Sequence, residues 1–281
     1  MIGSVFSPYY AWARRHGRGD PEHYCALNVA LYGPDRRAWA MTERGRARLS
    51  RSADTLAIGP SHLRWDGDTL VIDIAEVGAP IPRPIRGVVR VTPEVLTGQS
   101  FQIDSNARHH WWPIAPAARV EVAFRNPALD WSGPGYLDSN GGSEPLEAGF
   151  RDWDWSRMRL ADGSAAVLYD VLRRDDSRLR LGLRCDHQGR IERFEPAART
   201  TLPRTRWWRI PRAIQSEDPT ATRVLETLED TPFYARSTIV SVRRTTGLPR
   251  PRRWYPIAQH VAAARRSLRG TWRGAGAPAG G

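Results

Sequence analysis

The chain has 281 residues, of which 41% are hydrophobic and 26% are charged, a composition typical of a folded protein with one large or two small domains. The formal net charge is +12, and every basic residue counted in it is arginine, because the chain contains no lysine. No apolar run reaches the roughly 18 residues that span a bilayer, and no signal-peptide pattern is present. Cys25 and Cys185 are isolated, lack metal-ligand spacing and require no oxidising compartment.

The excess positive charge lies at the end of the chain. Residues 1–230 hold 32 arginines and all 30 acidic residues, whereas residues 231–281 hold ten arginines and no acid. The isoelectric point of about 10.8 would otherwise suggest a nucleic-acid partner. Because the body of the chain is nearly balanced and shows no nucleic-acid-binding motif, we expect no nucleic acid as a partner.

Short alternating apolar segments recur between turn signals, a pattern that predicts an all-β protein. The early segment SPYYAWAR (7–14) either lines a pocket or begins a barrel. The stretch 61–73 predicts two strands around an Asp-Gly turn. Further strands are predicted at 86–91, 119–124, 158–160, 165–169, 179–183 and 191–194. The helical signal is thin and is confined to 220–228 and the tail.

The stretch from 106 to 155 crowds ionisable groups among indole rings. Its motifs are NARHHWWPIAP, WSGPGYLDSNGG and DWDWSRMRLADG. They contain Trp111, Trp112, Trp131, Trp153 and Trp155, interspersed with His109, His110, Tyr136, Asp138, Asp152 and Asp154. An apolar aromatic pocket with a few convergent polar groups is typical of a small-molecule site.

Five collinear segments carry a resemblance to a known family. They are residues 3–33, WAMTERG (39–45), HHWWPIAP (109–116), WSGPGYLDSNGG (131–142) and DWDWSRMRLADG (152–163). They closely resemble the carotenoid 1,2-hydratases of purple photosynthetic bacteria, over about residues 3 to 240. Two departures stand out: family members usually begin with further residues, and the segment after about Val242 does not look like the family's usual end. We therefore expect this chain to lack early strands of its first barrel.

The resemblance implies a fold and an activity. The implied fold is two lipocalin-like antiparallel β-barrels packed together: an N-terminal domain at 1–148, a C-terminal domain at 149–245 and a basic tail at 246–281. The implied enzyme is a hydro-lyase that adds water to the terminal double bond of an acyclic carotenoid such as neurosporene or lycopene, giving a tertiary alcohol. The family's proposed catalytic residues fall on His109, Trp111, Tyr136 and Asp138.

The chemistry leads to the same residue types independently. Hydration of a trisubstituted alkene needs a proton at the less substituted carbon and water at the resulting tertiary cation, without metal, electron transfer or cofactor. Burial raises the pKa of a carboxyl and suits it to act as a general acid, and aromatic faces attract cations. Tyr136 and Asp138 are two residues apart, as are His109 and Trp111, so each pair shares one face of a strand.

Each candidate also has an ordinary structural interpretation. Asp138 is equally typical of a turn residue, His109 of a satisfied histidine and Tyr136 of a strand-end anchor. The substrate-binding candidates are Trp112, Trp131, Trp153, Tyr9 and Tyr10. The tryptophans alternatively fill a core, which is the expected role of Trp112 and Trp155. For Asp152 and Asp154 the default is an exposed strand face.

Two other functions are compatible with parts of the sequence. A lipocalin-like carrier of carotenoids or other lipids would need the rings but not a buried acid, and a nucleic-acid-binding protein is the third hypothesis. The histidines show no metal-binding motif, and neither a phosphate-binding loop nor a GxSxG elbow is present. The expected location is cytoplasmic, peripherally associated with the inner photosynthetic membrane.

The tail is predicted to be either a membrane-surface helix or a disordered basic extension. Its apolar residues recur at three- or four-residue steps, and they are Trp254, Ile257, Val261, Ala264, Leu268 and Trp272. Arginines surround this stripe and no acid is present. A basic helix with tryptophan on its apolar face tends to lie in the lipid interface.

Overall fold

In the computed structural model, the described residues are 1–33, 37–160, 162–243, 252–254 and 257–261, and most of them form antiparallel strands. They divide into two compact units. Unit 1 contains Met1–Leu146 together with residues 162–165 and Arg184–Glu192. Unit 2 contains Glu147–Leu160, Ala166–Leu183 and the described residues from Arg193 onward. The prediction of an all-β fold is confirmed.

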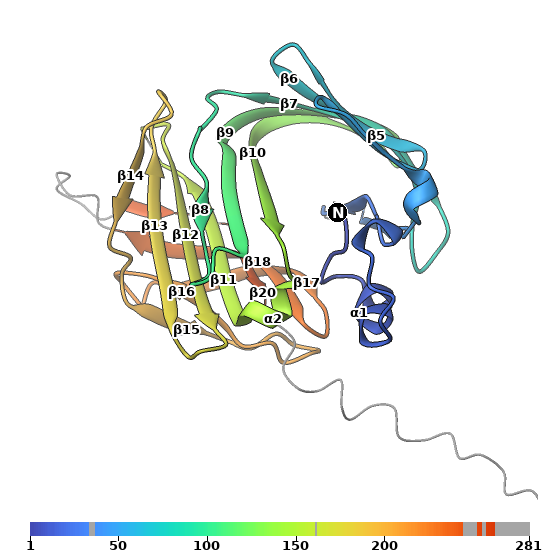
Figure 1. The fold of residues 1–281 in the computed structure, drawn as a ribbon. Coiled ribbons are helices and arrows are strands. Elements are labelled where there is room, and N and C mark those ends of the chain that lie inside the picture. Colours follow the sequence, from blue (N-terminus) through green and yellow to red (C-terminus); the bar gives the residue numbers. More distant parts are fainter. Residues whose placement is uncertain (34–36, 161, 244–251, 255–256, 262–281) are drawn as a thin grey trace, which may run out of the picture. The chain divides into compact units, whose positions relative to one another are not determined.

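Unit 1 is organised around one large sheet. The helical segments of this unit are α1 (Pro8–Arg15) and the 3-10 turns η1 (Pro21–His23) and η2 (Arg46–Arg48). Its strands are β1 (Asn28–Leu31), β2 (Ala38–Met41), β3 (Leu49–Arg51), β4 (Thr55–Ile58), β5 (Ser61–Asp66), β6 (Thr69–Val77), β7 (Pro84–Pro93), β8 (Phe101–Gln102), β9 (His109–Asn126) and β10 (Ala128–Gly142). The sheet runs in the order β10-β9-β7-β6-β5-β4-β3, with β8 paired to β9 (Figure 1).

Turn chemistry and alternation explain the hairpins of unit 1. Gly67 has a φ of 61°, which the Asp-Gly turn between β5 and β6 requires, so the predicted hairpin at 61–73 is confirmed. One face of β6, β7 and β9 buries the core side chains Ile74, Ile85, Val122 and Phe124, which pack against Val29 of β1 and Ala40 of β2. The small β1–β2 hairpin thus covers part of the large sheet.

The segment SPYYAWAR forms a helix, so the expectation that it begins a barrel is wrong. Ser7 is the N-cap of α1: its Oγ accepts a hydrogen bond from the Tyr10 backbone N–H at 2.9 Å, and Pro8 follows at the first helical position. Arg14 and Arg15 lie in the last turn, where positive charge favours the helix dipole. Local capping therefore outweighs the β-propensity of the aromatic residues.

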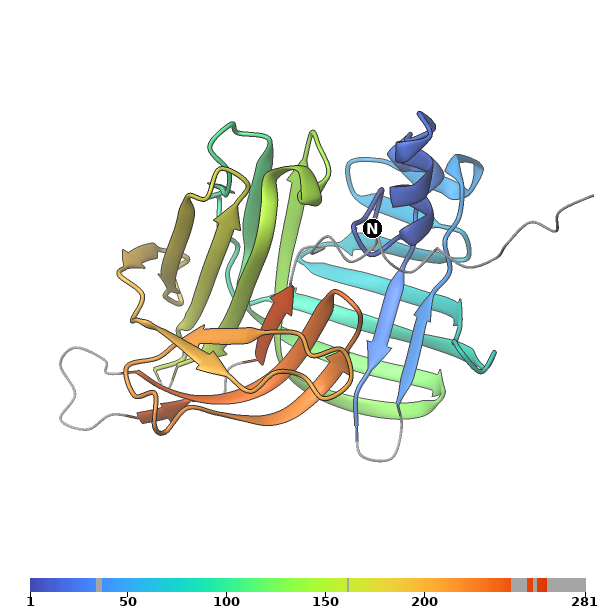
Figure 2. The ribbon, with the colours of Figure 1, turned by 90° about the horizontal axis from the view of Figure 1, so that it is seen from below.

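Unit 2 contains the second large sheet. The short helix α2 (Leu146–Gly149) precedes β11 (Phe150–Arg159), β12 (Ala165–Arg173), β13 (Arg178–Cys185), β14 (Ile191–Phe194), β15 (Arg199–Leu202), β16 (Arg212–Gln215), β17 (Arg223–Asp230), β18 (Tyr234–Arg243), β19 (Arg252–Trp254) and β20 (Ile257–Val261). The sheet order is β14-β13-β12-β11-β20-β18-β17, with β19 on β18 and β15–β16 as a separate hairpin. Figure 2 shows the orange strands β17 and β18 side by side, as their pairing requires.

The two helical predictions for this half of the chain are wrong where the structure describes them. Residues 223–230 form β17 in place of a helix over 220–228. Residues 257–261 form β20, which pairs with both β11 and β18, and Trp254 ends β19. Backbone pairing on both sides overrides a helical spacing of apolar residues. The rest of the predicted stripe, Ala264, Leu268 and Trp272, lies outside the described residues.

Two further points concern the predicted barrels and the membrane. In the described strands, the hydrogen-bonded path of each large sheet has two ends, and no closed barrel is formed. None of the helices described is long and apolar enough to cross a membrane.

Candidate active site

Asp138 is hydrogen-bonded to two of the other predicted catalytic residues. β9 and β10 are adjacent antiparallel strands, and Asn140 of β10 lies opposite Trp111 of β9. The Trp111 indole Nε1 donates to Asp138 Oδ2 at 2.8 Å, and the Tyr136 hydroxyl donates to the same oxygen at 3.1 Å. The structure thus brings Trp111, Tyr136 and Asp138 together, as the two i, i+2 pairs suggested.

Irregular pairing in β10 accompanies this arrangement. The register between β9 and β10 shifts on both sides of Leu137. Such bulges re-aim side chains and are common next to functional sites. Leu137 itself packs with Ala115 and Ala118 in the core of unit 1, while Asp138 reaches the Trp111 indole. Asp138 is therefore a strand residue with defined partners, and the turn interpretation of this residue is wrong.

The surroundings of this site are apolar on one side. Trp111 is 0% exposed, and its ring lies 5.7 Å from the ring of buried Phe101 on β8. Tyr136 and Asp138 are half-buried. A carboxyl group is thus held by two donors at the border between a buried aromatic wall and solvent. This arrangement can hold an acid proton beside an aromatic side chain, which suits acid-catalysed addition to an alkene.

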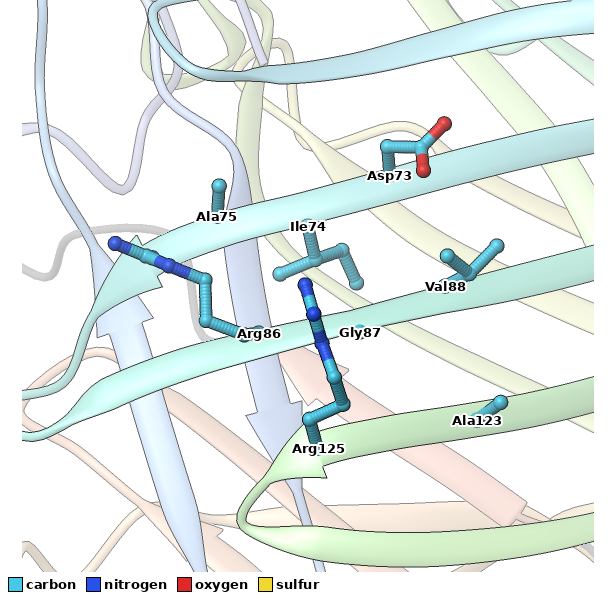
Figure 3. A pocket seen from close by; sticks show the side chains of 8 residues that line it. All are labelled: Asp73, Ile74, Ala75, Arg86, Gly87, Val88, Ala123 and Arg125. Carbon is cyan, nitrogen blue, oxygen red and sulfur yellow. The ribbon is translucent and has the colours of Figure 1, made fainter.

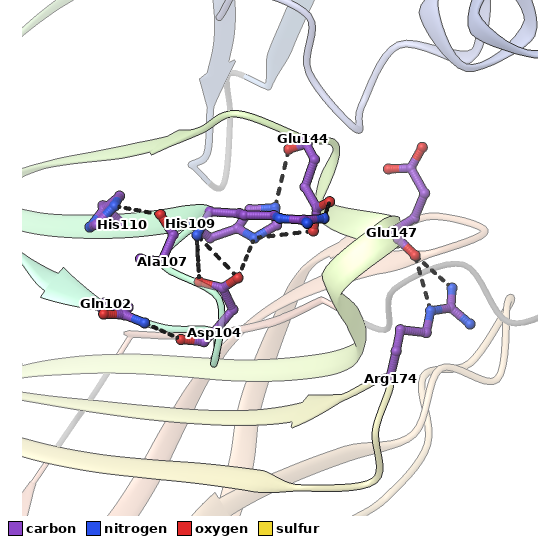
Figure 4. A network of polar contacts seen from close by, with 9 residues as sticks. Gln102, Asp104, Ala107, His109, His110, Glu144, Glu147 and Arg174 are labelled. Atoms are coloured by element: carbon purple, nitrogen blue, oxygen red, sulfur yellow. Dashed lines mark hydrogen bonds and ion pairs between the residues drawn. The ribbon is translucent and has the colours of Figure 1, made fainter.

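His109, the fourth predicted catalytic residue, sits in a polar cluster on the same strand (Figure 4). Its side chain is 2% exposed, and its Nε2 lies 3.1 Å from the Glu144 carbonyl oxygen, which can only accept. Its Nδ1 lies 3.6 Å from Asp104 Oδ2 and 4.0 Å from Glu144 Oε1. A ring that donates to a carbonyl and faces two carboxylates is poorly placed to take a proton from water.

The turn before β9 holds Asp104 against this histidine. Asp104 accepts the backbone N–H bonds of Arg108 and His109, each at 3.0 Å to Oδ1. Burial alone would raise the pKa of Asp104, but these backbone hydrogen bonds and the nearby His109 ring lower it below the ordinary 3.8. Asp104 is therefore a stable carboxylate that orients the imidazole.

Gly142, directly opposite His109 in the β9–β10 pairing, leaves room for the ring. A Cβ at this position would lie 2.9 Å from His109 Cδ2 and 2.8 Å from the Arg108 carbonyl oxygen. The second glycine of the LDSNGG motif is thus required by the close approach of the two strands.

The same cluster is the candidate metal centre of the described residues. One ligand atom each from Asp104, His109 and Glu144 lies within 4.8 Å of the others. The carboxylates already have protein partners, however, because Asp104 accepts backbone N–H bonds and Glu144 Oε2 accepts from Arg108 Nη1 at 2.7 Å. Both carboxylates of the cluster thus bond other protein groups in addition to facing the His109 ring.

The neighbouring aromatic candidates of unit 1 lie apart from the Asp138 contacts. His110 is exposed, with its Nε2 3.0 Å from the Ala107 carbonyl oxygen. Trp112 is 41% exposed and its Nε1 donates to the Thr97 carbonyl at 2.8 Å, so the expectation that it fills a core is wrong. Trp131 is 46% exposed.

The two tyrosines proposed to bind substrate differ in their surroundings. Tyr9 on α1 is 70% exposed. Tyr10 is buried, and its ring lies 5.4 Å from that of Tyr24. Nothing in these contacts assigns either residue to a ligand, and substrate binding by this helix stays a prediction.

The remaining acids and tryptophans of the motif-rich stretch belong to the interior of unit 2. Trp153 and Trp155 are buried, and Trp153 packs edge-on against Phe150. Asp154 is buried and pairs with Arg199 at 2.6 Å, so the expected exposed face of β11 is wrong. Burial, and next the charge of Asp154, raise the pKa of half-buried Asp152 above 3.8.

These acids belong to a larger buried network in unit 2. The fully buried carboxylate of Asp170 on β12 pairs with Arg178 Nη1 at 2.5 Å and accepts from Gln215 Nε2 at 2.9 Å. Arg199 lies between Asp170, at 3.7 Å, and Asp154. Opposite charges and an amide compensate the buried carboxylates, as buried ions require. We interpret the network as the polar part of the unit 2 interior.

A pocket of about 380 Å³ lies on β6, β7 and β9 of unit 1 (Figure 3). It is lined by Asp73, Ile74, Ala75, Arg86, Gly87, Val88, Ala123 and Arg125. None of the catalytic candidates is among these residues. The pocket is therefore not the site that the sequence motifs predicted.

Sequence reasoning missed Asp104, Glu144 and Phe101. Asp104 lies in a polar turn four residues before Arg108, and Phe101 on the two-residue strand β8, where no periodic pattern can be recognised. Glu144 follows the two glycines of the recognised motif. Only the glycine pair gave a signal, since it marks a close backbone approach.

Comparison with known proteins shows the family of the chain. The family model of carotenoid hydratase CrtC matches residues 1–248, so the chain belongs to this family. It is 55% identical over 239 residues to the acyclic carotenoid 1,2-hydratase of Thiocapsa roseopersicina, covering 85% of this chain and 59% of that protein. It is 49% identical over 261 residues to the enzyme of the same name from Rubrivivax gelatinosus, covering 89% of this chain and 64% of that protein.

The chain thus spans about three fifths of the length of these two relatives. Among solved structures, it is similar to a protein of Nitrosomonas europaea described as AttH, with a TM-score of 0.54 and 15% sequence identity. That match covers 85% of this chain and 86% of the other. At this identity the likeness concerns the fold alone.

Proposed function

We propose that this chain catalyses the 1,2-hydration of an acyclic carotenoid, such as neurosporene or lycopene, to a tertiary 1-hydroxy carotenoid. Family membership supports the reaction class. The observation that carries the proposal is the Asp138 carboxyl group, which is held by Trp111 and Tyr136 against a buried aromatic wall. The two relatives described above carry the name of this activity.

Asp138 is the proposed general acid. Its O–H bond breaks as a C–H bond forms at the less substituted alkene carbon, which leaves a tertiary cation at the neighbouring carbon. A water oxygen adds to that cation and its proton returns to the carboxylate, so the net change is the addition of one water. The Trp111 indole and the Tyr136 hydroxyl both donate to Oδ2 of this carboxyl group. The same two donors stabilise the carboxylate left after proton transfer.

Trp111 is the proposed cation-stabilising ring. Its hydrogen bond to Asp138 fixes the indole next to the acid, and its burial removes competing water. A ring face attracts a developing cation most strongly where the surroundings are apolar. Trp111 therefore couples the position of the acid to the position of the cation.

His109 has a positioning role in this proposal, in place of the catalytic role that the resemblance implied. The carbonyl of Glu144 and the carboxylate of Asp104 engage its ring, and it lies two residues before Trp111 on β9. A fixed side chain at this point stabilises the β9–β10 pairing on which Trp111 and Asp138 depend.

Finer statements about the fold and location are part of the proposal. We propose that the two sheets are lipocalin-like, that the reaction needs no cofactor because its atoms and electrons balance without one, and that the protein is cytoplasmic and peripheral to the inner photosynthetic membrane. Supporting observations are the antiparallel sheets of both units and the lipid solubility of the proposed substrate.

Coexpression with lycopene-producing enzymes tests the function. We expect hydroxylated carotenoids to accumulate, with the product oxygen derived from labelled water and not from dioxygen. A non-catalytic carrier would bind the polyene and leave it unchanged. If soluble, folded chain retains bound lycopene without converting it, the hydratase proposal is wrong for this chain and the carrier hypothesis replaces it.

A further inference from the structure

The loop between β15 and β16 presents two neighbouring tryptophans to solvent. Trp207 is 75% exposed and Trp208 is 55% exposed, and Trp207 has the highest value among the exposed large apolar side chains described. Arg206 and Arg209 on either side are exposed as well, so the loop tip is Arg-Trp-Trp-Arg. Adjacent exposed indoles of this kind mark an interaction surface.

The base of this loop is well anchored. Thr205 and Ile210, which flank the tip, are buried. The Thr205 backbone N–H donates to the Ile210 carbonyl at 3.1 Å, and the Ile210 N–H donates to Thr205 Oγ1 at 2.8 Å. Arg204 Nη1 donates to the Arg209 carbonyl at 3.0 Å. The four tip residues therefore extend from a closed, hydrogen-bonded neck.

Asp230, at the end of β17, fixes the backbone of the two tryptophans. Its carboxylate accepts the Trp207 N–H at 2.7 Å and the Trp208 N–H at 3.3 Å. These two N–H groups are thereby satisfied within the protein, and the side chains of the four exposed tip residues end in indole and guanidinium groups. A preorganised tip loses little conformational entropy when it binds a partner.

The chemistry of the tip fits a lipid–water interface. Arg204, Arg206 and Arg209 bring three positive charges, and the Arg206 guanidinium lies 5.2 Å from the Trp207 ring centroid. Indole rings favour the headgroup level of a bilayer, and arginine binds phosphate and other anionic headgroups. Single-stranded nucleic acid, the other ligand of basic aromatic surfaces, is bound along a groove of several nucleotides, which a four-residue tip does not provide.

We propose that residues 206–209 are an interfacial anchor that inserts its two indoles into the surface of an anionic bilayer. The proposal does not depend on the hydration chemistry, although it would place the protein where a polyene hydrocarbon dissolves. It also differs from the predicted tail anchor, because the loop belongs to the hairpin β15–β16.

The test is cosedimentation of the full chain with phosphatidylcholine vesicles that contain a quarter phosphatidylglycerol. We expect the double variant Trp207→Ser/Trp208→Ser to lower the partition coefficient at least about tenfold. The control is Trp12→Ser, because Trp12 on α1 is also exposed, at 53%, and lies beside an arginine. It should change partitioning less than about twofold.

The charge part is tested separately with Arg206→Gln/Arg209→Gln, which should weaken binding to anionic vesicles and reduce its salt dependence but leave binding to pure phosphatidylcholine unchanged. Circular dichroism and the thermal midpoint verify folding of each variant. If a folded tryptophan double variant binds the anionic vesicles as well as the parent chain, the loop is not the anchor. Binding of an oligothymidylate at the tip, without binding to vesicles, would equally overturn the proposal.

Discussion

Replacement of Asp138 by asparagine separates the chemical role of this residue from its structural role. Both hydrogen bonds from Trp111 and Tyr136 end on one oxygen, Oδ2, which the amide oxygen of asparagine can replace. A hydrogen bond to a charged group contributes about 1.5–3 kcal/mol and one between neutral groups about 0.5–1.5 kcal/mol. Because the proposed acid is neutral before the reaction, asparagine replaces one neutral acceptor with another, and the free energy of unfolding should fall by at most about 1.5 kcal/mol.

The effect on the reaction should be much larger. An amide cannot donate an acid proton, and removal of a general acid typically lowers a rate by about 10²–10⁴-fold, or about 3–5 kcal/mol of activation free energy. Because the same group is proposed to take the proton back from water, we expect the upper part of this range. Tyr136→Phe, which removes one donor and keeps the acid, should lower the rate less.

The assay is turnover of lycopene in detergent micelles or vesicles, with product quantified by chromatography and folding followed by near-ultraviolet circular dichroism. Asp130→Asn is the matched control, because Asp130 is an exposed carboxylate on the same strand β10 and should leave the rate unchanged. A folded Asp138→Asn chain with near-native turnover would refute the assignment of the acid and, with it, the proposed mechanism.

Four other outcomes are expected. Gly142→Ala should displace the His109 ring and destabilise unit 1 by about 1–3 kcal/mol, measured by denaturant unfolding; an unchanged midpoint would contradict the close approach. The pKa of Asp152 is raised in the folded state, so the stability that this residue contributes is present below pH 3.8 and is lost as the pH rises through the folded pKa. Asp152→Asn should therefore be more stable than the parent at neutral pH, and its stability should depend less on pH in this range. Chelation with EDTA should leave turnover unchanged, and a loss that zinc or magnesium restores would show that the His109 cluster holds a metal. Truncation after Val261 should leave the thermal midpoint unchanged, whereas a truncation that also removes β20 should unfold unit 2. Vesicle binding by the chain that ends at Val261 then shows whether residues 262–281 contribute an anchor.

Local sequence patterns predicted the secondary structure correctly where it depends on a single hairpin or on one face of a strand. The Asp-Gly turns and the alternation of 86–91 and 119–124 correctly predicted strands, because turn geometry and side-chain parity are properties of neighbouring residues. The helical spacing of apolar residues, in contrast, gave the wrong prediction for residues 223–230 and 257–261, which form strands. Residues 223–230 pair with the next strand, β18, and residues 257–261 pair with β18 and with the distant β11, so backbone pairing decided the conformation of both segments.

The candidate site shows the same division. The amino-acid sequence by itself predicted the family and the all-β class, and the resemblance to the family pointed to Trp111, Tyr136 and Asp138 as candidate site residues. Only the tertiary structure decided that both donors meet on one oxygen of Asp138, and that Asp104 and Glu144 clamp His109. Those contacts depend on the register of β9 against β10 and on the turn before β9, and register is a property of paired strands that no single segment contains.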